Sequence, residues 1–209
     1  MARARSAHFD GNRESILRAA AGLFARQGYP GTSMSDLAKA CGISKPLLYH
    51  YVDDKYQLLL EITEGHVSRL QALVAEVSAL KLDPHDSLRQ MIARFVQEYA
   101  EARHDHGVLT QDVKFLEPAD RERVLGIERH VVSAFARAIA SAHPRLKAGA
   151  LEKPLTMLLF GMINWMFTWL RPDGRLSHEQ MAPIVADLFL GGLGAVQLPR
   201  DPSSGPTSA

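Results

Sequence analysis

A segment near the N-terminus, SKPLLYHYVDDK at residues 44–55, concentrates side chains that could bind a polyanion. Tyr49, His50 and Tyr51 are consecutive, Lys45 precedes them and Lys55 follows them. A core helix spaces its aromatic residues three or four apart, so that they share one face. Three consecutive side chains point in different directions, so some of them must face outward. The alternative is a small connecting helix whose aromatic residues cover the core.

Residues that could support catalysis are not arranged in any motif that we recognise. The chain has no G-x-S-x-G, H-E-x-x-H, P-loop or dinucleotide-binding pattern. Its one cysteine, Cys41, is explained by packing. His104, Asp105 and His106 resemble a metal cluster, but the pattern places no further ligand nearby, so a polar turn between helices is the better explanation. We expect no catalytic residue, no metal and no cofactor.

The composition is that of a globular protein, with 46% hydrophobic and 22% charged residues among 209. A single cysteine excludes an intrachain disulfide, and no apolar signal-peptide core follows the first basic residues, so we expect a cytoplasmic protein. Residues 1–55 carry eight lysine and arginine residues against five acidic ones, a net charge of +3, and the remainder carries −2. This asymmetry fits contact with nucleic acid by the N-terminal part.

Apolar residues recur at intervals of three and four throughout the chain, and no segment is a convincing strand. The pattern predicts an all-α fold of about nine helices. We expect a disordered basic arm over 1–11, a small helical domain over 12–56, a larger helical domain over 57–196, and a disordered tail over 197–209. The first helix is expected over 12–27, and a broken segment is expected at about 105–117.

The elements that must position the 44–55 segment are short helices with clear caps. Ser33 and Asp36 have the capping-box spacing for a helix that ends at Gly42. Ser44 caps the next helix, and Asp53 or Asp54 caps a fourth. Two helices joined by a tight glycine turn form a helix-turn-helix pattern, in which the second helix of the pair enters the DNA major groove.

The stretch "G…TSMSDLAKACGISKPLLYHYVDDKYQLL" closely resembles the N-terminal DNA-binding domain of the TetR family of bacterial regulators, over about residues 12–60. The resemblance implies a homodimer that binds a palindromic operator in double-stranded DNA. It also implies roles for individual residues, with Lys45 facing base edges and Lys55 contacting a phosphate. The expected DNA-binding residues are Thr32, Ser33, Lys45, Pro46, Leu47, Tyr49, His50, Tyr51 and Lys55.

The most apolar stretch, PLTMLLFGMINWMFTWL, carries no charge from Pro154 to Leu170. Its length lies at the lower edge of the spanning range of about 17–25 residues, and it contains Gly161 and Asn164, so we expect no membrane span. We expect this helix to face its own core on one side and a second subunit on the other. The last helix, expected from Ser177 to Val196, contains Pro183, which should kink it.

The C-terminal part has more inward aromatic and methionine residues than a plain helical bundle needs, although such stripes are usually only core. Polar residues occur on or next to the same stripes, and burying one without a partner costs about 1–3 kcal/mol. The segment "GMINWMFTWLRPDGRLSHEQMAPIVADLFLGGL" also looks like TetR-type regulators that sense acyl-CoA thioesters. The expected ligand-binding residues are His66, Leu70, Met91, Phe95, Tyr99, Arg103, Phe115, Phe135, Met162, Asn164 and Trp165.

Three functions follow from these patterns. The leading hypothesis is a ligand-responsive transcriptional repressor, released from its operator by a small hydrophobic effector such as an acyl-CoA or aryl-CoA thioester. The second is a DNA-binding dimer whose C-terminal domain binds a protein partner and no metabolite. The third is a helical enzyme that acts on the same thioesters.

Overall fold

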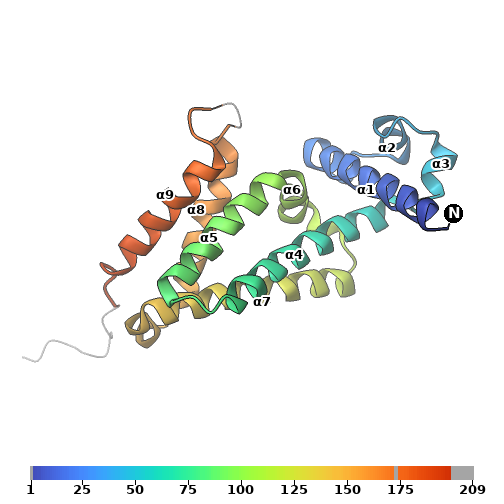
Figure 1. The fold of residues 1–209 in the computed structure, drawn as a ribbon. Helices are drawn as coiled ribbons and strands as arrows, with labels where there is room; N and C mark the ends of the chain where they lie inside the picture. Colours follow the sequence, from blue (N-terminus) through green and yellow to red (C-terminus); the bar gives the residue numbers. More distant parts are fainter. Residues whose placement is uncertain (1, 172–173, 199–209) are drawn as a thin grey trace, which may run out of the picture. The chain divides into compact units, whose positions relative to one another are not determined.

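The computed structural model describes residues 2–171 and 174–198, and every element within these ranges is helical (Figure 1). The all-α prediction is therefore confirmed. The α-helices are α1 (Ala2–Gln27), α2 (Met34–Ala40), α3 (Lys45–Tyr49), α4 (Lys55–Ala79), α5 (Pro84–Glu101), α6 (Arg103–Asp112), α7 (Pro118–Ala142), α8 (Glu152–Trp169) and α9 (His178–Leu193). Two short 3₁₀ helices, η1 (Val113–Phe115) and η2 (Pro144–Gly149), follow α6 and α7.

The chain divides by packing into two compact units. Unit 1 comprises Met1–Gln71 and Glu101–Glu128, and unit 2 comprises Ala72–Ala100 and Arg129–Ala209. Residues 101–128, which we expected in the C-terminal domain, thus pack with the helix-turn-helix segment. The physical reason is that α6 packs along α1 and buries Val108 and Leu109 in the core of unit 1.

Unit 1 is built around α1, whose buried residues include Ile16, Ala20 and Phe24. Leu37 of α2 and Leu48 of α3 are fully buried in the same core. The helix starts are capped as the sequence predicts. Ser33 and Asp36 form the capping box of α2, Ser44 caps α3, and Asp54 accepts a hydrogen bond from Gln57 N at 2.8 Å at the start of α4.

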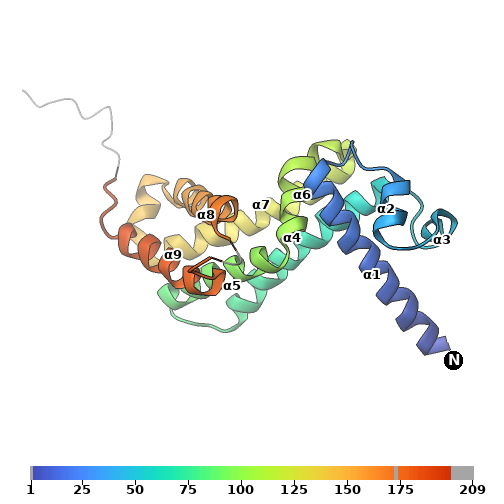
Figure 2. The same cartoon turned by 90° about the horizontal axis from the view of Figure 1, so that it is seen from above.

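Unit 2 has an aromatic core. The ring of Phe135 in α7 lies 4.7 Å from that of Phe95 in α5 and 5.0 Å from that of Phe160 in α8, all measured between ring centres. Figures 1 and 2 show α8 and α9 side by side. Arg145 donates to the backbone oxygens of Leu193 at 2.9 Å and Gly194 at 2.6 Å, and so satisfies the C-terminal carbonyls of α9.

Several elements differ from the sequence-based expectations. α1 begins at Ala2, whereas we expected a disordered arm over 1–11, because residues 2–10 contain no glycine or proline to stop the helix. The segment expected to be broken at 105–117 is ordered as α6 and η1. α9 contains Pro183 within its length as expected, and the kink expected there stays a prediction. Most of the predicted C-terminal tail, from residue 199 on, lies outside the described residues.

Candidate nucleic-acid interface

α3, which we call the recognition helix, is held to unit 1 by its buried face and by a cap at its N-terminal end. Ser44 Oγ accepts from Leu47 N at 3.3 Å, and Pro46 occupies the first turn, where a missing N–H costs little. Leu48 is fully buried, and Val52 just beyond the helix is also buried. Gly42 joins α2 to α3 with φ of +66°, a conformation that favours glycine. The remaining side chains of α3 are therefore free to face outward.

The structure brings most of the predicted DNA-binding residues together on this outward side. Lys45, Pro46, Leu47, Tyr49 and His50 are all exposed, with Leu47 at 42% and Tyr49 at 47%. An ammonium group, an exposed leucine and an aromatic ring are the side chains that contact phosphates, thymine methyl groups and sugars. The side chains on this surface are therefore of the types that bind DNA.

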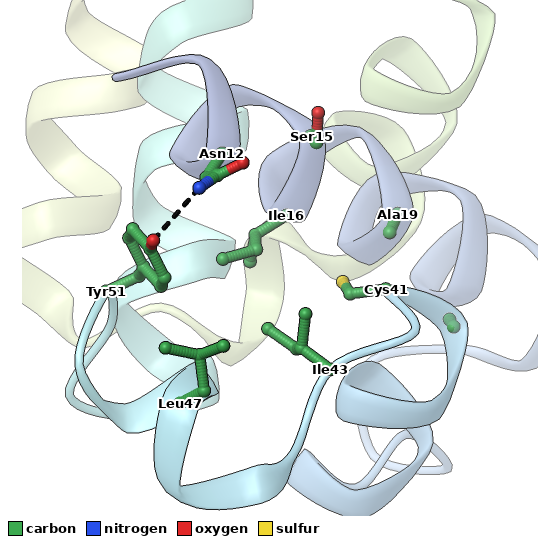
Figure 3. A pocket seen from close by; sticks show the side chains of 9 residues that line it. Asn12, Ser15, Ile16, Ala19, Cys41, Ile43, Leu47 and Tyr51 are labelled. Atoms are coloured by element: carbon green, nitrogen blue, oxygen red, sulfur yellow. Dashed lines mark hydrogen bonds between the residues drawn. The ribbon is translucent and has the colours of Figure 1, made fainter. Parts of the chain in front are cut away.

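Tyr51 lies at the edge of this surface and is only partly exposed. Its hydroxyl oxygen accepts a hydrogen bond from Asn12 Nδ2 of α1 at 3.0 Å (Figure 3). Its ring lies 5.5 Å from the ring of His50, centre to centre, in an edge-to-face arrangement. Tyr51 thus connects the end of the recognition helix to α1.

Three predicted DNA-binding residues make contacts inside the protein. The Thr32 hydroxyl is buried and donates to Gly28 O at 3.0 Å, and Ser33 is engaged in the capping box of α2. Lys55 Nζ donates to Tyr29 O at 2.9 Å and Thr32 O at 3.0 Å. These residues shape the loop between α1 and α2, and any contact of theirs with DNA would be additional to that role.

The same loop is attached to the end of α6. The backbone N–H of Tyr29 donates to Asp112 Oδ2 at 3.0 Å, and the ring of Tyr29 lies 5.7 Å from that of Phe115. Asp112 is buried, and burial raises the pKa of its carboxyl group, while the bond from Tyr29 acts in the opposite direction. The loop before α2 therefore lies between Lys55 at the start of α4 and Asp112 at the end of α6.

The predicted ligand-binding residues are divided between the two units. His66, Leu70, Arg103 and Phe115 belong to unit 1, and the other seven belong to unit 2. Met91, Phe95, Tyr99 and Phe135 are buried in unit 2, and Met162 is partly buried. Asn164 and Trp165 lie on the exposed face of α8, with Trp165 67% exposed, so within one chain they do not line an enclosed pocket. Their helical spacing matched a core stripe, but the opposite face of α8 is the buried one.

The buried His66 forms the centre of a polar cluster in unit 1 whose other members reach the surface. Its Nε2 lies 3.2 Å from His106 Nδ1, and Arg69 bonds to Asp105 Oδ2 at 2.6 Å beside it. Burial, followed by the nearby His106 and Arg69, lowers the pKa of His66 from 6.5 to about 3, so its ring is neutral at pH 7. Among the described residues, no group of three or more histidine, cysteine, aspartate or glutamate side chains could hold a metal ion.

Sequence patterns did not identify Asn12 or Asp112 as residues that contact the helix-turn-helix segment. Both contacts join residues that are far apart in the chain, since Asn12 and Tyr51 are separated by 39 in residue number and Tyr29 and Asp112 by 83. Helical periodicity predicts which face of a helix is buried, but it does not predict the side chain that will lie opposite.

Two short helices joined by a glycine turn, packed on a third helix and presenting exposed side chains of the second, define a helix-turn-helix DNA-binding protein. Among the described residues, no helix is long and apolar enough to cross a membrane.

Comparison with known proteins specifies the family. Residues 16–62 match the family model of bacterial regulatory proteins of the tetR family, and residues 81–193 match the tetracyclin repressor-like C-terminal domain. A TetR-family regulator from Bordetella parapertussis 12822 is 34% identical, with a TM-score of 0.81 over 88% of this chain and 97% of that one. The HTH-type transcriptional repressor KstR2 of Rhodococcus jostii RHA1 is 28% identical over 88% of this chain and 91% of its own length.

The chain therefore belongs to the TetR family and is a DNA-binding transcriptional regulator. TetR-family regulators are not enzymes, in agreement with the lack of catalytic motifs. AibR, solved in complex with isovaleryl coenzyme A and operator DNA, shares the fold at 24% identity, with a TM-score of 0.72 over 85% of this chain and 97% of that one.

Proposed function

We propose that this regulator is a homodimeric repressor that binds a palindromic operator and leaves it when a hydrophobic CoA thioester binds. The observation that carries DNA binding is the exposed set of lysine, leucine and tyrosine side chains on α3, held on a buried Leu48. Each protomer presents one recognition helix, so a dimer reads two half-sites whose centres are about 34–36 Å apart.

Support for a dimer comes from the exposed apolar face of α8 and α9. Met157, Leu158, Trp165 and Trp169 of α8 and Ile184 and Leu188 of α9 are each about half exposed or more. Monomeric proteins rarely leave so many large apolar side chains on adjacent helices in water. A second copy of the same face would cover them, as two-fold interfaces require. Gly191 and Gly192, also exposed on α9, would allow close approach of the partner helix.

Support for the effector comes from the relatives and from the interior of unit 2. AibR binds isovaleryl coenzyme A, and KstR2 of Mycobacterium tuberculosis is described as a ketosteroid transcriptional regulator. Phe95, Phe135 and Phe160 form an aromatic core in unit 2, and these rings are the apolar surface that an acyl or aryl group would contact on entering it. An effector that binds more tightly to a conformation with the wrong half-site spacing shifts the population off DNA.

The test uses the full-length protein and a duplex selected by it from a random-sequence library. Footprinting should show a protected inverted repeat, and Lys45→Ala should weaken binding of that duplex without lowering the unfolding temperature. Lys153→Ala, which removes the same charge from unit 2, is the matched control. Protection of a single, non-repeated site would contradict the proposal that the protein binds DNA as a dimer.

The effector is tested with a panel of acyl-CoA thioesters that includes isovaleryl-CoA, with free CoA and isovalerate as controls. We expect at least one thioester to raise the unfolding temperature and to release the selected duplex, and the two fragments to do neither. If no thioester changes either measurement, the effector class is wrong. A C-terminal domain that binds a protein partner would then be the next hypothesis to test.

A further inference from the structure

The recognition helix is too short to orient itself. α3 contains five residues, and isolated helices shorter than about 12–15 residues are marginal in water. Its N-terminal end is fixed by the Ser44 cap and its middle by the buried Leu48. Beyond its C-terminal end, Tyr51 N bonds back to Leu48 O at 3.0 Å, which closes a turn but does not attach the turn to the rest of unit 1.

The buried Val52 and one side-chain hydrogen bond attach this turn to the rest of unit 1. Asn12 Nδ2 donates to the Tyr51 hydroxyl at 3.0 Å, from the part of α1 that passes beside the turn (Figure 3). Because an amide NH₂ group only donates, the bond uses a lone pair of the Tyr51 oxygen. The hydroxyl hydrogen takes no part in this contact. The bond therefore fixes the position of the Tyr51 oxygen relative to α1.

The Tyr51 ring packs against the core of unit 1 on one side and borders a hollow on another. This hollow, of about 260 Å³, is lined by Asn12, Ile16, Ile43 and Leu47 among other residues. Figure 3 shows these side chains bordering the space, with Leu47 of the recognition helix and Tyr51 on the same side of it. A ring that borders open space can move into that space unless a directional contact holds the ring in place. The hydrogen bond from Asn12 supplies that contact.

We propose that Asn12 is a positioning residue for DNA recognition, which holds Tyr51 and the end of α3 in the orientation that fits the operator. The residue itself need not touch DNA. Its effect is on the geometry of Tyr51 and of Leu47, which borders the same hollow. This inference requires only DNA binding by unit 1, and it is independent of the identity of the effector.

The test is a double-mutant cycle with Asn12→Ala and Tyr51→Phe in the full-length protein. The probes are the duplex selected by the wild-type protein and a non-specific poly(dA-dT) duplex. We expect each single variant to weaken binding of the selected duplex by about fivefold, and the double variant to be no weaker than either single one. Binding of the non-specific duplex and the slope of affinity against salt should stay unchanged, since no charge is removed.

Ser15→Ala is the matched control. Ser15 lies three residues further along α1 and lines the same hollow, but its hydroxyl donates to Gly11 O of its own helix at 3.0 Å. We expect this variant to bind the selected duplex as wild type does. A merely structural role for Asn12 would lower the unfolding temperature and weaken both duplexes alike. That result, an additive cycle, or an Asn12→Ala variant with unchanged affinity would each overturn the proposal.

Discussion

The amine of Lys55 lies 2.9 Å from the backbone oxygen of Tyr29 and 4.4 Å from the centre of the Tyr29 ring. Tyr29 therefore receives both a charge-assisted hydrogen bond and a cation–π contact from one side chain. Since Lys55 begins α4 and Tyr29 lies in the loop before α2, this pair fixes the entrance to the helix-turn-helix.

Removing that amine should destabilise unit 1. We expect Lys55→Met, which keeps most of the aliphatic stem, to lower the free energy of unfolding by about 1–3 kcal/mol because two carbonyl oxygens lose a charged donor. Chemical denaturation measures the change. Lys39→Met removes the same charge from an exposed position on α2 and should cost less than about 0.5 kcal/mol. Equal losses in the two variants would contradict the role assigned to Lys55.

The predicted phosphate contact of Lys55 is a separate question. If the amine also contacts a phosphate, the slope of log affinity against log salt should fall by about one unit in Lys55→Met. An unchanged slope together with lower stability would restrict Lys55 to the interior contacts.

Asp112 should respond differently to two substitutions. Asp112→Asn keeps an oxygen that can accept from Tyr29 N and removes a charge whose burial raises the pKa, so the free energy of unfolding should stay equal or increase. Asp112→Ala leaves the backbone N–H of Tyr29 without this acceptor, so it should lower the free energy of unfolding by about 1–2 kcal/mol. Because the folded-state pKa is raised, the contribution of Asp112 to stability is lost as pH rises through that pKa. Greater destabilisation by Asn than by Ala would refute this assignment.

Acidification should destabilise the protein through His66. The folded-state pKa is about 3, below the ordinary 6.5, so the unfolded chain takes up a proton that the folded protein excludes. Stability is therefore full above pH 6.5 and declines as pH falls toward 3, by about 2 kcal/mol between pH 7 and pH 5. Denaturation at both pH values measures this difference. In His66→Gln the difference should shrink by a similar amount, and an unchanged difference would mean that His66 is accessible to protons in the folded state.

Charging the exposed face of α8 and α9 should separate the protomers. Trp165→Glu and Leu188→Glu each place a carboxylate on a side chain position that is 67% exposed in the single chain, so the fold should survive. Sedimentation should then give the monomer mass of 23.1 kDa, whereas the wild type should give twice that mass. Leu82→Glu, at an exposed position before α5, is the control and should remain dimeric. If both α8 and α9 variants keep the dimer mass, the interface lies elsewhere.

Much of the fold was predictable because the information is local. The capping box at Ser33, the cap at Ser44 and the glycine turn at Gly42 depend on residues at most a few positions apart, and the structure confirms them. The exposure of Lys45 and Tyr49 follows from the same local geometry, since Leu48 must face the core.

The remaining features depend on what lies opposite a helix face. Lys55 has the same sequence context whether its amine meets a phosphate or the carbonyls of Tyr29 and Thr32. Trp165 has an aromatic side chain at helical spacing whether α8 turns that face to its own core or to another chain. In both cases the choice is made by residues distant in the sequence, which a single sequence does not identify.

The bond between Tyr29 N and Asp112 also makes one amide proton informative in solution. Loop amides usually exchange with solvent deuterium quickly, but this one is bonded to a buried carboxylate on another helix. It exchanges only when the end of α6 separates from the loop. The deuterium uptake of Tyr29 thus counts those separations directly, and comparing it with the uptake of Leu37, inside α2, distinguishes a local opening of the loop from unfolding of the whole helix-turn-helix.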